Sequence, residues 1–256
     1  MPAEWKSGWV EMQKNILYED EDIMVVFKPA GIATQTARIG QQDMVSELKN
    51  YLAGKGLHKG EKEPYLGLVH RLDQPVSGLL AFGKSKRGAA GLSRLVTEGK
   101  LQKYYYAVVL GRMKEERGSF CNYLYKDSKT NQSMVVPEDF KGAKEAVLEY
   151  EQLSTLAVFG DGRESVKKLP EVSLVRIRLL TGRHHQIRVQ FANAGYPLLG
   201  DNKYGNDASR DLSAKAGCKS IALCAYRLDF DHPVTGKKMS FEKKPEDPVF
   251  VPFFTL

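Results

Sequence analysis

The sequence predicts an α+β fold. Along its 256 residues, predicted strands outnumber predicted helices. The two kinds do not alternate regularly, which favours α+β over a doubly wound parallel sheet. Neither an internal repeat nor a low-complexity linker divides the sequence. We therefore predict an N-terminal tail over residues 1–14 and a single domain over residues 15–256.

The predicted strands are short apolar or alternating runs bounded by Gly and Pro. They cover residues 23–27, 79–82, 104–110, 146–150, 175–179, 220–228 and 238–241. In the segment 175–179, Arg176 and Arg178 alternate with apolar residues. This alternation predicts a half-buried strand with a basic outer face.

Three helices are predicted from apolar residues at helical spacing. They follow Asp43, cover Ser85–Thr97 and cover His184–Ala194. Asp43 is a typical N-cap residue, and Gly54 is typical of the position just after a helix end. The stretches Gly54–Pro64 and Met113–Gly118 are predicted to be connecting loops.

The charge of the chain favours a polyanionic partner. Lys and Arg total 38 against 31 Asp and Glu, a formal net charge of +7, which attracts nucleic acid through counterion release. No apolar run approaches the roughly 20 residues that span a bilayer, and Met1–Gln13 lacks the apolar region of a secretory signal. Three scattered cysteines fit neither a disulfide framework nor a zinc knuckle. We expect a cytoplasmic protein without a membrane partner.

The segment from His70 to Gly78 concentrates chemically useful groups. It reads His-Arg-Leu-Asp-Gln-Pro-Val-Ser-Gly and places Arg71 two residues before Asp73. In an extended segment, residues two apart share a face, so both side chains can point into one cleft. A surface turn with a solvated ion pair is the alternative. The local pattern leaves both interpretations open.

This segment closely resembles the His-Arg-Leu-Asp-x-x-Thr-Ser-Gly motif of the RluA-type pseudouridine synthases, with Val76 where Thr is usual. Further segments match the family in the expected order from about Ile16 to Phe241. They are Lys28-Pro29-Ala30-Gly31, Lys103–Gly111, Thr181–Arg188, Gly200-Asp201, Tyr204-Gly205, Ala222–Ala225 and His232-Pro233. His184 stands where Thr is common, and Cys224 stands where His is frequent.

The resemblance implies a mixed, mainly antiparallel central sheet with flanking helices and loops, and an active-site cleft across the sheet. It also implies that the chain converts uridine in ribosomal or transfer RNA to pseudouridine. The bond between the base nitrogen and the ribose breaks, the uracil rotates, and carbon 5 forms the new bond. We expect RNA as the partner and a monomer. No cofactor is needed, because the reaction is redox-neutral, and no metal site is predicted, because His184 and His185 would diverge by about 100° on a helix.

The family's catalytic roles map onto three residues. Asp73 corresponds to the essential aspartate, which acts at the sugar as nucleophile or base, and the sequence leaves both open. Burial disfavours a charged carboxylate, so a fixed cation is needed nearby, and the family's pattern assigns Arg188 to this role. Tyr105 is implied to face the target base. By strand alternation, Tyr104 and Tyr106 are expected to pack on the opposite face.

Five further residues are implied to handle the RNA: His70, Arg71, Arg183, His185 and Gln186. Taking a base out of its stack costs a few kcal/mol, and Arg71 is expected to fill the vacated space or to hold a phosphate. Because Met1–Asn15 is too short for an RNA-binding module, we expect residues 54–64 and 113–118 to govern substrate choice.

Two other function classes make different predictions. A catalytically silent RNA-binding protein on the same scaffold would lack the catalytic Asp, Tyr or Arg, yet Asp73, Tyr105 and Arg188 are all present. A phosphate-transferring or metal-dependent hydrolase would need a Gly-rich phosphate loop or clustered carboxylate and His ligands. The sequence contains neither pattern.

Overall fold

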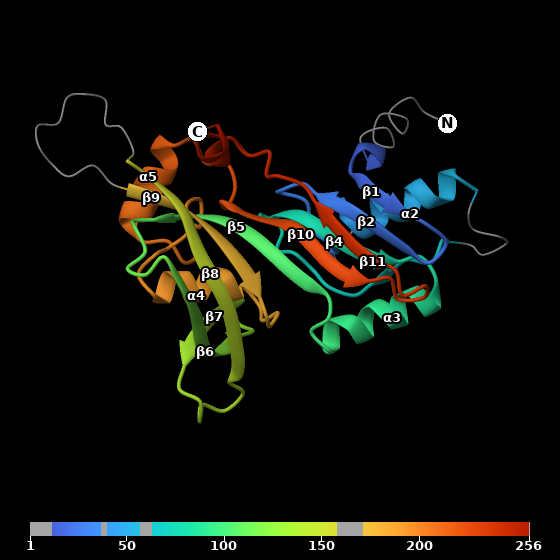
Figure 1. Cartoon of the computed structure of the whole chain (residues 1–256), viewed down its shortest axis with the longest axis horizontal. Helices are drawn as coiled ribbons and strands as arrows, with labels where there is room; N and C mark the ends of the chain where they lie inside the picture. The colour runs from blue at the N-terminus through green and yellow to red at the C-terminus, as the bar shows by residue number, and fades with distance from the viewer. Residues whose placement is uncertain (1–11, 37–39, 57–62, 158–170, 256) are drawn as a thin grey trace, which may run out of the picture. The chain divides into compact units, whose positions relative to one another are not determined.

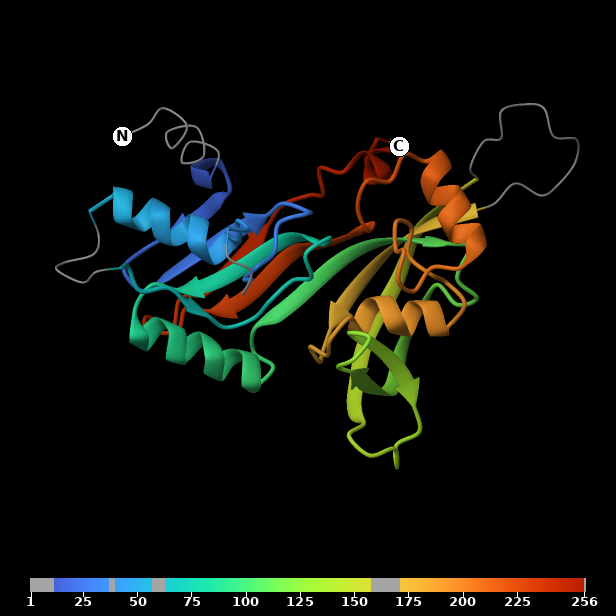
Figure 2. The same ribbon diagram turned by 180° about the vertical axis from the view of Figure 1, so that it is seen from behind.

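The computed structural model describes residues 12–36, 40–56, 63–157 and 171–255 (Figures 1 and 2). They form two compact units, each built from two separate segments. Unit 1 contains residues up to Gln102 and Ala225–Lys243, and unit 2 contains Lys103–Cys224 and the residues from Lys244 onward. Antiparallel pairing dominates both units, which confirms the predicted α+β class. The single domain over residues 15–256 stays a prediction, and residues 1–11 of the predicted tail lie outside the described residues.

Unit 1 contains a sheet with the strand order β1-β2-β4-β10, in which β3 pairs with β4 and β11 with β10. The strands are β1 (Ile16–Glu19), β2 (Ile23–Lys28), β3 (Gly67–Leu68), β4 (Ser77–Gly83), β10 (Leu223–Asp231) and β11 (Lys238–Glu242). Every residue of β2 is buried, and β2 pairs with β4 so that Lys28 lies opposite Gly78. Because the two strands are antiparallel, the turn after β2 and the loop before β4 lie at the same end of the sheet. This adjacency positions the His70–Gly78 segment.

Two helices accompany this sheet. The N-cap of α2 (Met44–Gly54) is Asp43, whose side chain accepts a hydrogen bond from the Ser46 N–H at 2.8 Å, as predicted. The helix includes Gly54, and the glycine with a positive φ that follows the helix is Gly56, at 69°. The helix end predicted at Gly54 is therefore too early. The second helix, α3 (Lys86–Thr97), matches its predicted range and packs against β4.

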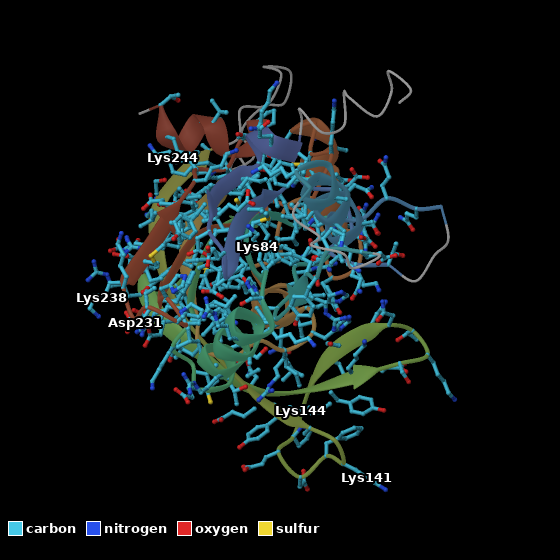
Figure 3. All side chains as sticks on the ribbon, turned by 90° about the vertical axis from the view of Figure 1, so that its right-hand side faces the viewer. Lys84, Lys141, Lys144, Asp231, Lys238 and Lys244 are labelled. Carbon is cyan, nitrogen blue, oxygen red and sulfur yellow. The ribbon has the colours of Figure 1, made fainter. Side chains whose placement is uncertain are left out.

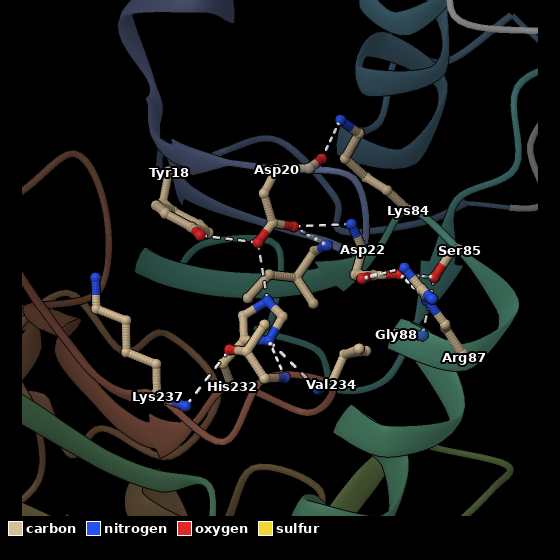
Figure 4. A network of polar contacts seen from close by, with 12 residues as sticks. Tyr18, Asp20, Asp22, Lys84, Ser85, Arg87, Gly88, His232, Val234 and Lys237 are labelled. Atoms are coloured by element: carbon tan, nitrogen blue, oxygen red, sulfur yellow. Dashed lines mark hydrogen bonds and ion pairs between the residues drawn. The ribbon is translucent and has the colours of Figure 1, made fainter.

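A polar network joins the turn after β1 to the turn after β10 (Figure 4). Nδ1 of His232 accepts hydrogen bonds from the backbone N–H groups of Val234 and Thr235. The ring proton therefore sits on Nε2, which donates to Asp20 at 2.8 Å. The His232-Pro233 landmark thus has a structural role, because it links residues 212 positions apart.

Unit 2 contains the strand order β5-β9-β8-β6-β7, with antiparallel pairing throughout. Its strands are β5 (Gln102–Leu110), β6 (Arg117–Asp127), β7 (Gln132–Val136), β8 (Lys144–Ala157) and β9 (Glu171–Leu179). Its helices are α4 (Gln186–Asn193), α5 (Asp207–Lys215), the 3-10 helix η1 (Pro248–Phe250) and α6 (Val251–Phe254). In the described part of the chain, no helix has the length and apolar character needed to cross a bilayer.

Several of these elements differ from the sequence prediction. Strands β1, β3, β6 and β7 and helix α5 were not predicted, and β6 begins inside the stretch Met113–Gly118 that was expected to be a loop. The burial pattern of β6 is irregular, with exposed or half-buried residues throughout except Leu124. A strand without one buried face gives little hydrophobic alternation, which is the signal that sequence reasoning depends on.

The outer face of β9 carries Arg176 and Arg178, as predicted, but glutamates of the neighbouring strand β8 balance their charge. Arg176 and Arg178 lie opposite Glu151 and Glu149 of β8. Arg176 forms an ion pair with Glu151, and Arg178 with Glu149 at 3.3 Å. Cross-strand pairs of opposite charge support the sheet. The strand therefore has its arginines on the outer face as predicted, but the glutamates of β8 balance their charge.

Candidate functional site

In unit 1, Asp73 is half-buried on the loop that precedes β4. Its two neighbours in sequence are tied to the segment after β2. Thr34 Oγ1 donates to the Leu72 carbonyl at 2.8 Å and accepts from the Leu72 N–H at 3.2 Å. The Gln74 carbonyl accepts from the Gly31 N–H, and Gln74 Nε2 donates to the Gly31 carbonyl, both at 2.9 Å. The backbone of Asp73 is thus fixed on both sides.

A buried ammonium group completes this anchoring. Lys28, the last residue of β2, is fully buried. Its Nζ donates to the carbonyls of Pro29 at 2.9 Å, Ile32 at 2.7 Å and Gln74 at 3.1 Å, which matches the three donors of an ammonium. Burial lowers the pKa of Lys28 to about 7, and the negative charge of Asp73 opposes this shift. The sequence pattern indicates only a turn here, so it missed Lys28.

Three other residues of the same segment have distinct environments. His70 Nε2 accepts a hydrogen bond from the Ala81 N–H at 3.0 Å, which ties the ring to β4. Gly78 has a φ of 134°, and a Cβ there would lie 2.4 Å from the backbone nitrogen of Ala225 on β10. Only glycine tolerates both this conformation and this close approach. Arg71 is exposed.

In unit 2, Arg188 of α4 forms a buried ion pair with Asp201. Its Nε and Nη2 donate to the two carboxylate oxygens at 2.8 and 2.9 Å, and the side chains are 6% and 1% exposed. Asp201 also accepts from the N–H groups of Lys203 and Tyr204, and the guanidinium lies 5.1 Å from the centroid of the Tyr204 ring. Burial acts to raise the pKa of Asp201, but the hydrogen bonds and charge of Arg188 lower it below its ordinary value.

The loop before α4 is fastened by Gln186, whose side chain is buried. Its Oε1 accepts from Thr181 Oγ1 at 2.8 Å and from the Arg183 N–H at 3.0 Å. Its Nε2 donates to the Val147 carbonyl at 3.1 Å. Both ends of the amide are thus bonded within the protein. Arg183 is exposed, and its Nε donates to the Glu145 carbonyl at 2.7 Å.

The two histidines of this loop stack on each other, with ring centroids 3.6 Å apart. His185 is the N-cap with a φ of 55°, so α4 begins at Gln186 and not at His184. This left-handed residue turns the chain, which corrects both the predicted helix start and the predicted divergence of the rings. His184 Nδ1 bonds to Ser133 Oγ at 2.8 Å, and His185 Nδ1 to the Tyr204 hydroxyl at 2.7 Å. Across the described ranges, no three His, Cys, Asp or Glu are grouped to hold a metal.

Tyr105 is a buried residue of β5, 5% exposed, and pairs with Ile177 of β9. Tyr104 and Tyr106 are half-buried. Tyr106 packs edge-on against Phe254, with centroids 5.3 Å apart. The strand thus distinguishes Tyr105 from its two neighbours, and Tyr106 has the packing role expected of it.

Comparison with known proteins identifies the family. A family model described as RNA pseudouridylate synthase matches residues 22–193, which include Asp73, Tyr105 and Arg188. The chain belongs to the RluA-type family of RNA pseudouridine synthases. It is 34% identical to ribosomal large subunit pseudouridine synthase D of Zymomonas mobilis over 91% of this chain and 69% of that protein. It is 30% identical to tRNA pseudouridine synthase C of Yersinia pestis over 91% of this chain and 87% of that protein.

A solved structure confirms the fold of this pseudouridine synthase. Human RNA pseudouridylate synthase domain containing 4 has a TM-score of 0.70 with it and 22% identity, with 94% of each chain covered. The predicted mixed sheet with mainly antiparallel pairing is therefore correct. As a member of the family, the enzyme isomerises uridine to pseudouridine in RNA.

Replacing Lys28 by Met should change how stability depends on pH. The pKa of lysine is about 10.4 in an unfolded chain and that of Lys28 is about 7 in the fold. Between these values the unfolded state binds more protons, so the free energy of unfolding of the parent rises with pH. Lys28→Met should lose this rise in urea unfolding measured from about pH 6 to about pH 9. Lys86→Met, at an exposed lysine of α3, should keep it. If the free energy of unfolding rose equally with pH in the parent and in Lys28→Met, the lowered pKa assigned to Lys28 would be refuted.

Replacing Asp201 by Asn should destabilise the fold strongly. The change leaves the Arg188 guanidinium buried without its counter-charge, which costs about 3–5 kcal/mol. Urea unfolding measures the loss. Asp207→Asn is the matched control, because Asp207 pairs with Arg210 at 3.2 Å on the exposed face of α5, and it should have little effect. Similar losses of unfolding free energy in both variants would show that the buried ion pair stabilises the fold no more than the exposed one.

Proposed function

We propose that Asp73 is the catalytic carboxylate of this isomerase and acts at the ribose as nucleophile or base. The supporting observation is its fixed placement. Leu72 and Gln74 are hydrogen-bonded to the segment after β2, and the buried ammonium of Lys28 interacts electrostatically with Asp73. A catalytic group that is held in place before the flipped nucleotide binds makes the reaction faster, because less entropy is lost when the two are brought together.

Arg188 and Tyr105 complete the proposed catalytic group. Arg188 is proposed for this group because the family's pattern has a catalytic arginine at its position. Its support is that Asp201 holds the buried guanidinium in one orientation through two hydrogen bonds. Tyr105 stacks on the target uracil, which is worth roughly 1–3 kcal/mol per base. Its support is its distinct position in β5, away from the packing role of Tyr106.

The RNA-handling residues fall into two groups. Arg71 and Arg183 are exposed, so they can contact RNA phosphates or fill the space that the flipped base leaves. We assign His185 to the same group of RNA-contacting residues. His70 and Gln186 make internal hydrogen bonds to Ala81 and to the loop before α4. For these two we propose that they position the loops that contact RNA.

The substrate is proposed to be ribosomal or transfer RNA, because relatives named for each are similar over 91% of the chain. Of the loops expected to govern substrate choice, residues 57–62 lie outside the described residues. The odd number of cysteines supports a cytoplasmic location. The monomeric state stays a prediction.

Asp73→Asn should abolish pseudouridine formation while the fold and RNA binding persist. The amide keeps the shape of the side chain but is neither a nucleophile nor a base at neutral pH. Turnover is measured on unmodified ribosomal and transfer RNA transcripts, with binding measured in parallel. Asp211→Asn, at an exposed position of α5, should retain the parent rate. Parent-like turnover by Asp73→Asn would contradict the assignment.

Tyr105→Ala should reduce turnover far more than Tyr104→Ala, because only Tyr105 is assigned to the target base. Tyr105→Phe keeps the ring and separates stacking from any role of the hydroxyl. Steady-state rates on the same transcripts measure these effects. Equal losses for the two alanine variants would mean that the face of β5 assigned to the base is the wrong one.

A further inference from the structure

Strand β5 of unit 2 carries a lysine that the catalytic assignment does not use. Lys103 is the second residue of this strand and is half-buried. Burial lowers the pKa of its ammonium, and no charged neighbour among the described residues contributes to this shift. Within the same residues, the ammonium takes part in no hydrogen bond and no ion pair. It thus differs from the ammonium of Lys28, which has three carbonyl acceptors.

The strand pairing shows on which side of the sheet the Lys103 side chain lies. Lys103 and Tyr105 are two residues apart in β5, so their side chains leave the strand on the same face. Tyr105 pairs with Ile177 of β9, which pairs with Tyr150 of β8, and residues paired in this way share a face. The Tyr150 ring packs against Phe191 of α4, with centroids 6.0 Å apart. Lys103 therefore lies on the face of the sheet that α4 covers.

The ammonium approaches the loop that leads into α4. A Cβ added at Gly182 would lie only 3.3 Å from Lys103 Nζ, so the lack of a side chain at Gly182 leaves room for the ammonium. Arg183 follows Gly182 and is exposed, and its Nε donates to the Glu145 carbonyl at 2.7 Å. Two cations therefore flank Gly182, one exposed at the surface and one half-buried on the sheet.

An unpaired ammonium in this environment destabilises the protein when no ligand is bound. Removing a charge from water without a partner costs free energy, and no described residue offsets that cost at Lys103. An anion that enters with a ligand would offset it. In RNA the full negative charges are on the phosphates. A phosphate is therefore the group of the substrate that fits this position.

We propose that the Lys103 ammonium binds a phosphate next to the target uridine while the base of that uridine stacks on Tyr105. The inference rests on the proposed function, which assigns Tyr105 to the target base. Two residues of a strand span roughly 7 Å, so one nucleotide reaches both side chains. Tyr105 is 5% exposed and Lys103 is half-buried, which places the base deeper and the phosphate nearer to the surface. This contact is separate from the one proposed for Arg183, because it holds the target nucleotide itself.

The test compares charged and neutral phosphates beside the target. The parent enzyme first identifies its uridine on the ribosomal and transfer RNA transcripts. A short fluorescein-labelled RNA around that uridine is then synthesised with natural phosphates, or with a neutral methylphosphonate on the 5′ side or on the 3′ side of the uridine. Fluorescence anisotropy over a range of salt concentrations gives each dissociation constant. The full-length Asp73→Asn protein is used, so that no turnover occurs.

Lys103→Met keeps the length of the side chain and removes its charge. Added to Asp73→Asn, it should weaken binding of the natural RNA by about tenfold and lower the salt slope by about one. It should weaken one of the two methylphosphonate RNAs by less than about twofold, because that RNA has already lost the phosphate that Lys103 binds. Lys103→Arg, which keeps the charge, should retain most of the affinity. Equal weakening of all three RNAs, or of none, would overturn the proposal.

Lys141→Met is the matched control, because it removes the same charge from an exposed lysine in the turn between β7 and β8 (Figure 3). It should weaken the natural RNA and both methylphosphonate RNAs to the same small extent. A loss as large and as selective as that of Lys103→Met would show that the effect is not specific to Lys103.

Urea unfolding separates binding from a purely structural role of Lys103. Lys103→Met should unfold at a higher urea concentration than the protein that carries Asp73→Asn alone, because the unpaired ammonium is gone. A lower midpoint would mean that Lys103 supports the fold, which would overturn the argument. Failure of the proposed function is distinguishable. It would show as turnover retained by Asp73→Asn, or as equal losses of turnover in Tyr105→Ala and Tyr104→Ala.

Discussion

The Nζ atom of Lys28 donates to carbonyls from two segments that are far apart in sequence, and the position of the Asp73 loop depends on it. An unpaired ammonium inside a protein is costly, so the three acceptors at 2.7–3.1 Å must all be present. The end of β2, the turn after it and the loop before β4 are therefore held as one assembly. The close approach of Gly78 to Ala225 fixes the other end of that loop.

Linear motifs are what assign roles to Asp73, Tyr105 and Arg188 in our proposal, because the family's chemistry leaves a fixed residue order in the sequence. Lys28 and Asp201 belong to matched segments as well, but their roles depend on partners that only the fold supplies. Lys28 needs the Gln74 carbonyl, and Asp201 needs a guanidinium from α4. Strong periodic elements such as α3 were predicted within a residue of their observed bounds. The β6 and β7 strands were missed because neither buries one face consistently.

Charge in unit 2 is organised by pairing, and the exceptions are informative. Arg176 and Arg178 face glutamates across strands, and Arg188 is held by Asp201 inside the protein. The formal net charge of +7 therefore says little about where a polyanion binds. Lys126, Lys144 and Arg183 line a cavity with no acidic neighbour in its wall. A local excess of positive charge is a more specific indication of nucleic acid than the total charge.

Unit 1 is discontinuous along the chain, and this has a consequence for biosynthesis. Its strands β2 and β4 leave the ribosome early, whereas β10 and β11 lie beyond residue 222. The hydrogen bond between Asp20 and His232 also waits for these late residues. At translation rates of about 5–20 residues per second, this delay is on the order of ten seconds. During that time the edge of β4 has no β10 partner, and an unpaired edge invites association with other chains. Nascent chains of this enzyme therefore pass through an interval in which β4, the strand that follows the Asp73 loop, has an unpaired edge, and a pause in translation before β10 would lengthen this interval.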